Sequence, residues 1–179
     1  MTLIRVFISI QVPDTAPLRD ILSDIKGTDG VRPSPESQMH LTMKFIGDVD
    51  DRKVPRIADA ARKAVEGIPP FEISLRGAGA FPNVRSARVM WVGAEPAATL
   101  KRIADGIADN LSGISFDDKP FKSHMTVGRC QYPKDVSSIV ARYEDAEFTR
   151  FECREILVMR SELSRSGAKH SVLSRIPLL

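Results

Sequence analysis

Two short stretches of this chain each place a histidine two residues before a threonine. They are Met39-His40-Leu41-Thr42-Met43 and Ser123-His124-Met125-Thr126-Val127. In an extended strand, side chains two residues apart lie on the same face, so each stretch can present an imidazole and a hydroxyl group together. The chain has only three histidines, and two of them follow this pattern. The repeat therefore marks the first candidates for a functional site.

Two histidines and two threonines suit a reaction that needs proton transfer beside a developing negative charge. The unperturbed pKa of histidine is about 6.5, so one imidazole can accept a proton and another can donate one near neutral pH. A hydroxyl group on the same face can donate a hydrogen bond to an oxygen that gains charge. A zinc site made by His40 and His124 is an alternative, but no set of cysteines or carboxylates with ligand spacing accompanies them.

Composition indicates an ordinary globular protein. Its 179 residues, 42% of them hydrophobic and 27% charged, predict one domain over residues 1–179 and exclude a disordered chain. No apolar run approaches a membrane span, and the first residues do not resemble a signal peptide, so we expect a cytoplasmic protein without a membrane partner. Cys130 and Cys153 are expected to be reduced thiols. The basic tilt of residues 154–179 fits either a solvated face or a surface that guides a phosphate-bearing partner.

Strands and helices that could position the two stretches alternate along the chain. Hydrophobic periodicity, together with proline and glycine boundaries, predicts strands at 5–12, 39–47, 71–75, 87–92, from about 121, at 151–163 and at 170–176, and helices at about 15–26, 52–66 and 96–111. Residues 27–38 are expected to be mainly loop and 133–145 a weak polar segment. Residues 77–83 are expected to be a turn that joins the strands on either side as a hairpin with a long connection. Because the two motifs follow helices and are separated by almost half the chain, the pattern predicts an α+β fold with two similar lobes.

Several stretches together carry a resemblance to a known family. They are Arg5-Val6-Phe7-Ile8, His40-Leu41-Thr42-Met43-Lys44-Phe45-Ile46-Gly47, Gly79-Ala80-Phe81-Pro82, residues 89–93 around Trp91, His124-Met125-Thr126-Val127-Gly128-Arg129 and Ser161-Glu162-Leu163. The sequence resembles the two-histidine (2H) phosphoesterase superfamily, in particular its RNA 2′,3′-cyclic phosphodiesterase branch, also called 2′-5′ RNA ligases. The resemblance implies two pseudo-symmetric lobes, each an antiparallel sheet with helices outside, around a central cleft.

The same resemblance implies a reaction and its participants. The reaction would be hydrolysis of a 2′,3′-cyclic phosphate on RNA to a 2′-phosphate, with reversible 2′-5′ joining as a related activity. By analogy with the family, His40 would be the general acid and His124 the general base, while Thr42 and Thr126 would contact phosphate oxygens. No metal and no cofactor is expected, the partner would be RNA with a cyclic phosphate or a 2′-5′ linkage, and the chain would act as a monomer. An RNA- or nucleotide-binding module with weak catalysis on the same fold is the alternative.

Two further positions follow the motifs at the same offset. The family places a phosphate-contacting arginine where this chain has Arg129, although strict alternation from His124 would turn that side chain away. A bulge at Gly128 would bring it back, and a surface or lobe-packing arginine is the alternative. Phe45 either stacks on a base or ribose of the substrate, or shares the core with Leu41 and Met43.

The other ionisable residues near the motifs have simpler explanations. Lys44 should lie on the same face as His40 but outside the catalytic set. His170, the third histidine, is expected to be solvated or packed on a strand, with contact to RNA as the alternative. The acidic cluster after the first motif is best explained as a turn that caps the following helix.

Overall fold

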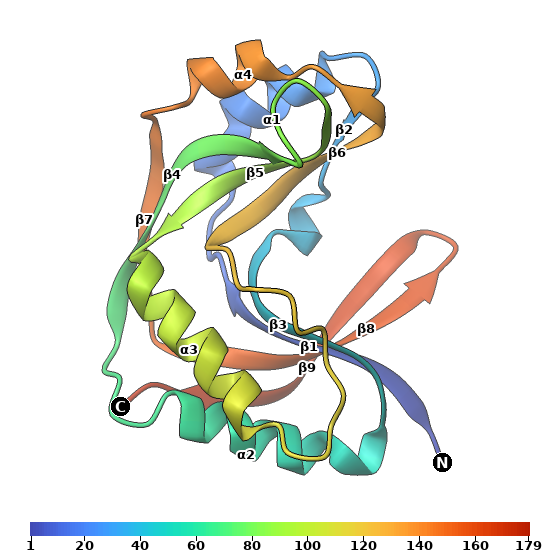
Figure 1. Cartoon of the computed structure of the whole chain (residues 1–179), viewed down its shortest axis with the longest axis vertical. Coiled ribbons are helices and arrows are strands. Elements are labelled where there is room, and N and C mark those ends of the chain that lie inside the picture. The colour runs from blue at the N-terminus through green and yellow to red at the C-terminus, as the bar shows by residue number, and fades with distance from the viewer.

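The first of two antiparallel sheets contains both ends of the chain. The computed structural model describes residues 1–179, and its strands and helices are shown in Figure 1. The strand order of this sheet is β3-β1-β8-β9. The strands are β1 (Leu3–Gln11), β3 (His40–Asp50), β8 (Glu155–Ser164) and β9 (Gly167–Pro177). The first His-x-Thr motif therefore lies on an edge strand, paired on one side with β1.

The second sheet carries the other motif. Its order is β2-β6-β5-β4-β7, and all of its pairings are antiparallel. The strands are β2 (Val31–Pro33), β4 (Phe71–Phe81), β5 (Ala87–Glu95), β6 (His124–Lys134) and β7 (Glu147–Cys153). The predicted α+β class with two antiparallel sheets is confirmed.

Helices cover the outer faces of both sheets. They are α1 (Arg19–Lys26), α2 (Val54–Ala64), α3 (Ala97–Asn110) and α4 (Ser137–Arg142). Helix α2 packs on β8 and β9 and α3 on β3, whereas α1 packs on β2 and β6 and α4 on β4. The two lobes therefore do not correspond to the first and second halves of the chain. Helix α1 follows β1 in the sequence but covers the other sheet, and β8 and β9, near the end of the chain, belong to the same sheet as β1.

Segment 27–38, which was expected to be mainly loop, contains a strand. Strand β2 pairs with β6 so that Arg32 lies opposite Arg129 and Pro33 opposite Gly128. Three residues that include a proline carry no alternating pattern, and β2 is stabilised by a partner almost a hundred residues away. The local sequence therefore did not indicate it.

The single strand expected at 151–163 is wrong. Two strands occupy this stretch: β7 ends at Cys153 and β8 begins at Glu155, with Arg154 between them. The two strands belong to different sheets. Apolar residues continue on both sides of the break, so periodicity alone does not mark it. In the preceding polar segment, β6 extends to Lys134 and α4 follows.

The turn expected at 77–83 starts later than predicted, because β4 continues to Phe81, but β4 and β5 do pair antiparallel as a hairpin. Its glycines serve the strand in two ways. Gly77 has a positive φ of 72° next to a register shift, which is typical of a bulge. Gly79 lies against the indole of Trp91, and a Cβ there would come within 2.2 Å of the ring.

The acidic cluster after the first motif behaves as expected, since the Asp50 side chain accepts a hydrogen bond from the backbone N–H of Arg52 ahead of α2.

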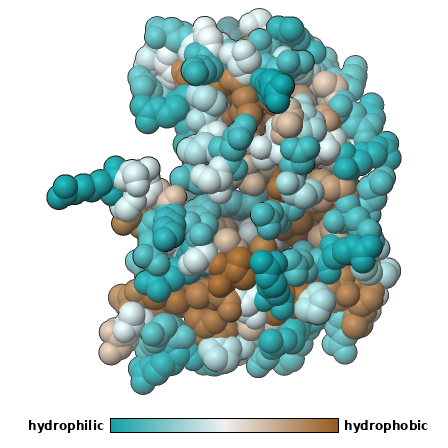
Figure 2. Space-filling view, turned by 180° about the vertical axis from the view of Figure 1, so that it is seen from behind, coloured by the Kyte–Doolittle hydropathy of each residue, from teal (hydrophilic) through white to brown (hydrophobic).

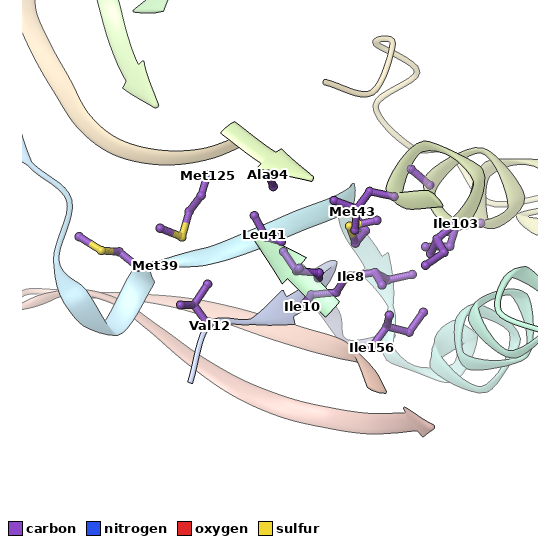
Figure 3. Packing of buried hydrophobic residues seen from close by; sticks show 14 of the residues in the cluster. Ile8, Ile10, Val12, Met39, Leu41, Met43, Ala94, Ile103, Met125 and Ile156 are labelled. Atoms are coloured by element: carbon purple, nitrogen blue, oxygen red, sulfur yellow. The ribbon is translucent and has the colours of Figure 1, made fainter. Parts of the chain in front are cut away.

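One continuous core joins the two lobes. It contains 43 buried residues drawn from both sheets and from the helices. Figure 3 shows Met125 of β6 pointing toward Met39 and Leu41 of the first lobe, while Met43 and Ile8 point toward α3. Helices α2 and α3 approach closely at Gly106, where a Cβ would lie 3.2 Å from Ala64. None of the helices has the length and hydropathy of a membrane span.

Replacement of Ile8 should destabilise the whole fold. This side chain is fully buried on β1, the strand that links β3 to β8. We expect Ile8→Ala to lower the free energy of unfolding by about 2–5 kcal/mol through lost burial and the cavity left behind. Leu3→Ala on the same strand is the matched control, because Leu3 is 57% exposed. Urea unfolding followed by circular dichroism measures both, and equal effects would contradict the assignment of β1 to the core.

Candidate active site

Both His-x-Thr motifs line one cleft between the two sheets. The cleft has a volume of about 390 Å³ and includes the side chains of His40, Thr42, His124 and Thr126. In the space-filling view of Figure 2, the outline of the molecule is notched beside the projecting β8–β9 hairpin. Residues of that hairpin, including His170, form one wall of the cleft. The fold thus brings together two motifs that are far apart in sequence.

A register shift in β3 determines which residues after Thr42 reach the cleft. Ser9 pairs with Thr42 and Ile8 with Lys44, so Met43 is an extra residue in the ladder. Met43 and Lys44 are consequently both buried, and Phe45 turns back to the cleft with 40% of its surface exposed. The expectation that Lys44 lies on the histidine face is wrong, as is the core alternative for Phe45.

Lys44 compensates for its burial through contacts with the segment before β6. Its ammonium group lies 5.2 Å from the ring centroid of Phe116 and 3.5 Å from the carbonyl oxygen of Asp117. These contacts give the charge an aromatic face and an acceptor within a protein environment. Lys44 therefore tethers residues 116–117 to β3 and does not point into the cleft.

The second motif carries a register shift at the same offset. Trp91 pairs with Thr126 and Met90 with Gly128, which leaves Val127 as the extra residue. Val127 and Gly128 are both buried, and Arg129 points back to the cleft. A Cβ at Gly128 would lie 3.2 Å from Ile25 and 3.3 Å from the carbonyl oxygen of Arg32, so this bulge packs against α1 and β2. The bulge at Gly128 is present, and it places Arg129 where Phe45 lies in the other lobe.

His124 has a defined tautomer. Its Nδ1 lies 2.6 Å from the carbonyl oxygen of Lys122, and a carbonyl only accepts, so Nδ1 carries the hydrogen. Nε2 of the neutral ring is therefore the nitrogen with a free lone pair. Phe81 packs edge-on against the imidazole, with ring centroids 5.0 Å apart. Burial lowers the pKa of His124, which keeps the ring neutral at pH 7.

His40 lies in a stack of three rings. Phe7 stacks on its face at 4.9 Å and His170 meets it edge-on at 5.3 Å. Burial, followed by charge repulsion from His170, lowers the pKa of His40 to about 4. His170 contacts Phe7 as well, at 4.9 Å, and thus lies in the cleft beside the first motif.

Cationic side chains surround the cleft without a carboxylate among the residues that line it. Arg5, Arg32 and Arg129 contribute three guanidinium groups. Arg32 and Arg129 lie directly opposite each other on β2 and β6, an arrangement in which like charges repel. An anion in the cleft would relieve this repulsion. No group of three or more His, Cys, Asp or Glu side chains is arranged to hold a metal ion.

Sequence reasoning missed part of this charged lining. Arg32 was overlooked because its segment was expected to be loop, and Arg5 carried no assigned role although it stands in one of the recognised stretches. The only local signal for Arg5 is its position beside Phe7 on a predicted strand, which is too common to identify a site. Its guanidinium also lies 3.7 Å from the carboxylate of Asp48, so this arginine is partly neutralised.

The fold and the cleft define a class of two-lobed proteins that present one His-x-Thr pair from each sheet. A sequence model described as the 2′-5′ RNA ligase superfamily matches residues 12–165. The RNA 2′,3′-cyclic phosphodiesterase of Archaeoglobus fulgidus is 34% identical over 167 residues, covering 91% of this chain and 94% of that protein. The protein of the same name from Methanothermobacter thermautotrophicus is 31% identical over 173 residues, covering 92% and 93%. This chain belongs to the 2′-5′ RNA ligase superfamily.

Solved structures agree with this assignment. TT0787 of Thermus thermophilus superposes with a TM-score of 0.80 at 28% identity and covers 97% of both chains. E. coli LigT, in a structure with 3′-AMP, superposes with a TM-score of 0.75 and covers 99% of both chains. At 23% identity, that second likeness concerns the fold alone.

The protonation of His40 can be followed directly. We expect its imidazole to titrate with a midpoint near pH 4, below the usual 6.5, because the ring is buried beside His170. The unfolded chain then binds more protons than the folded one as the pH falls from 6.5 toward 4, so stability decreases over that window. In His170→Gln the midpoint should rise but stay below 6.5, since burial remains. NMR of histidine side chains measures this, and a midpoint of 6.5 in the parent protein would contradict the buried stack.

Proposed function

We propose that this chain hydrolyses RNA 2′,3′-cyclic phosphate ends to 2′-phosphates by general acid–base catalysis with two histidines. The observation that carries the proposal is the convergence of both His-x-Thr pairs, from different sheets, on one cleft lined by arginines. The names of the curated relatives support the substrate, because several are RNA 2′,3′-cyclic phosphodiesterases that match most of this chain.

His124 is the general base in this mechanism. Its free Nε2 takes the proton of a water molecule as the water oxygen attacks phosphorus. The hydrogen bond from Nδ1 to the carbonyl of Lys122 strengthens as the ring becomes positive, and so stabilises the imidazolium that forms. The bond between phosphorus and O3′ breaks on the opposite side, where His40 donates its proton to the leaving oxygen.

His40 must carry a proton before it can act as the acid. In the empty cleft burial and repulsion favour its neutral form, as described above. A bound phosphodiester places a negative charge beside the ring, and an opposite charge within about 4–6 Å raises a histidine pKa. Substrate binding and proton uptake by His40 are therefore coupled.

The remaining residues of the cleft hold the phosphate and the nucleotide. Thr42 and Thr126 donate hydrogen bonds to the non-bridging oxygens, which gain charge in the transition state. Arg129 supplies a guanidinium to the same oxygens, and Phe45 offers an exposed ring to a base or ribose. No step needs a metal ion or cofactor, because both proton transfers use imidazoles. All of these groups come from one chain, so the reaction needs no second copy, and we propose that the protein acts as a monomer.

Removal of either histidine should nearly abolish turnover. We expect His40→Ala and His124→Ala each to lower kcat by about 10²-fold or more on an oligoribonucleotide with a 2′,3′-cyclic phosphate, assayed in excess EDTA. His170→Ala is the matched control, because it removes a histidine from the same cleft without removing either proton-transfer group. Chromatography identifies a 2′-phosphate as the expected product.

The outcomes of this assay distinguish the proposed enzyme from the alternative functions. Binding of the oligonucleotide without turnover by the parent protein would support the RNA-binding module instead. Turnover that EDTA abolishes would contradict the metal-free mechanism. Near-parental rates in both histidine variants, with circular dichroism unchanged, would place the reaction elsewhere.

Arg129 should act chiefly on substrate binding. We expect Arg129→Ala to raise KM about tenfold, because a charged hydrogen bond to the phosphate is lost, and Arg129→Lys to restore part of it. Arg85→Ala is the control, since Arg85 lies outside the cleft. Steady-state kinetics on the same oligonucleotide checks this, and an unchanged KM in Arg129→Ala would assign the residue to packing.

A further inference from the structure

A second groove opens from the catalytic residues in another direction. It has a volume of about 800 Å³ and shares Thr42, Phe45, His124 and Arg129 with the first cleft. His40 lines the first cleft but not this groove. The two depressions therefore meet at the reacting groups: the first cleft reaches both motif histidines, whereas the second groove reaches His124 alone.

The wall of the second groove is formed mainly by aromatic and cationic side chains. Phe81 of β4 and Phe121 supply rings, and Lys119 and Lys122 supply ammonium groups from the segment between α3 and β6. Lys122 lies over the ring of Phe81, 5.1 Å from its centroid. The carboxylate of Asp117 accepts a hydrogen bond from the backbone N–H of Lys119 at 3.0 Å. Rings beside cations suit a base and its phosphate backbone.

We infer that this second groove binds the RNA strand that carries a free 5′-hydroxyl group, the partner in 2′-5′ joining. The inference rests on the proposed function, because there the nucleophile enters on the side of His124. A hydroxyl group can take the position of the water only if its nucleoside reaches His124 without crossing His40. The second groove provides that approach, and it is far larger than a water molecule requires.

The joining step balances without any further reactant. The 5′-oxygen attacks phosphorus and forms the new P–O5′ bond, while the P–O3′ bond of the cyclic phosphate breaks. His124 takes the proton of the 5′-hydroxyl, and His40 gives its proton to O3′. The product is a 2′-5′ phosphodiester with a free 3′-hydroxyl. The reverse step cleaves such a linkage, with the two histidines exchanging roles.

The test compares two reactions in the same variants. One substrate is an oligoribonucleotide with a 2′,3′-cyclic phosphate, hydrolysed by water. The other is a short oligoribonucleotide with a single 2′-5′ linkage, whose cleavage requires the nucleotides on the 5′-oxygen side of that linkage, with their own phosphates, to be bound. We expect Phe121→Leu and Lys119→Ala each to lower kcat/KM for the 2′-5′ linkage about tenfold, the loss typical of one stacking or phosphate contact. Hydrolysis of the cyclic phosphate should change less than about twofold.

The variants are chosen so that a loss of activity reports on the groove and not on misfolding. Leucine at position 121 keeps an apolar side chain at a half-buried position. The matched control for Lys119→Ala is Lys101→Ala, which removes an exposed lysine from α3. Equal loss of both reactions in Phe121→Leu and Lys119→Ala would assign the groove to the cyclic-phosphate strand and overturn the inference. No loss of either reaction would overturn it too. If the parent protein hydrolyses the cyclic phosphate but does not cleave the 2′-5′ linkage, the inference fails while the proposed function stands; absence of cyclic-phosphate hydrolysis would count against the function itself.

Discussion

The shared core beneath the cleft is the constraint on which the site depends. In each motif the residue between histidine and threonine points away from the cleft, and these residues, Leu41 and Met125, are almost completely buried. Met125 points toward Leu41 and Met39 across the junction of the two sheets (Figure 3). Since apolar packing at this junction holds β3 and β6 together, it also sets the distance between His40 and His124. Burial of two apolar side chains thereby positions four polar ones.

The paired bulges complete this arrangement. Regular strands would send Phe45 and Arg129 into the core or away from the cleft, because alternate residues face opposite sides. One extra residue after each threonine reverses that alternation, so the fifth residue after each histidine faces the cleft again. Both lobes have the same bulge, but the side chain that it turns toward the cleft differs: the aromatic ring of Phe45 in one lobe and the guanidinium of Arg129 in the other. The symmetry of the backbone thus gives the cleft chemically distinct sides.

Electrostatics make the empty cleft a poor environment for more positive charge. Three arginines and three histidines line it without a carboxylate, and burial keeps the histidines neutral. An anionic substrate relieves the repulsion between arginines and favours protonation of His40 at the same time. Binding energy from the phosphate is in this way connected to the protonation state that the chemistry requires. The neutral tautomer of His124 needs no such change, because the carbonyl of Lys122 already orients it.

The sequence by itself determined the residue types of the site and most of the elements that carry them. His-x-Thr spacing, the apolar stripe of α3 and the β-branched first strand are local patterns, and local patterns report which face of an element is buried. Only the tertiary structure decided how the strands pair. It separated β7 from β8 at Arg154, added the strand β2, and introduced the bulges, of which the one in β3 buries Lys44 and exposes Phe45. It also brought Arg32, Arg5 and His170 to the cleft. These features depend on pairings between residues far apart in the chain, and such pairings leave no periodic trace in the sequence around either partner.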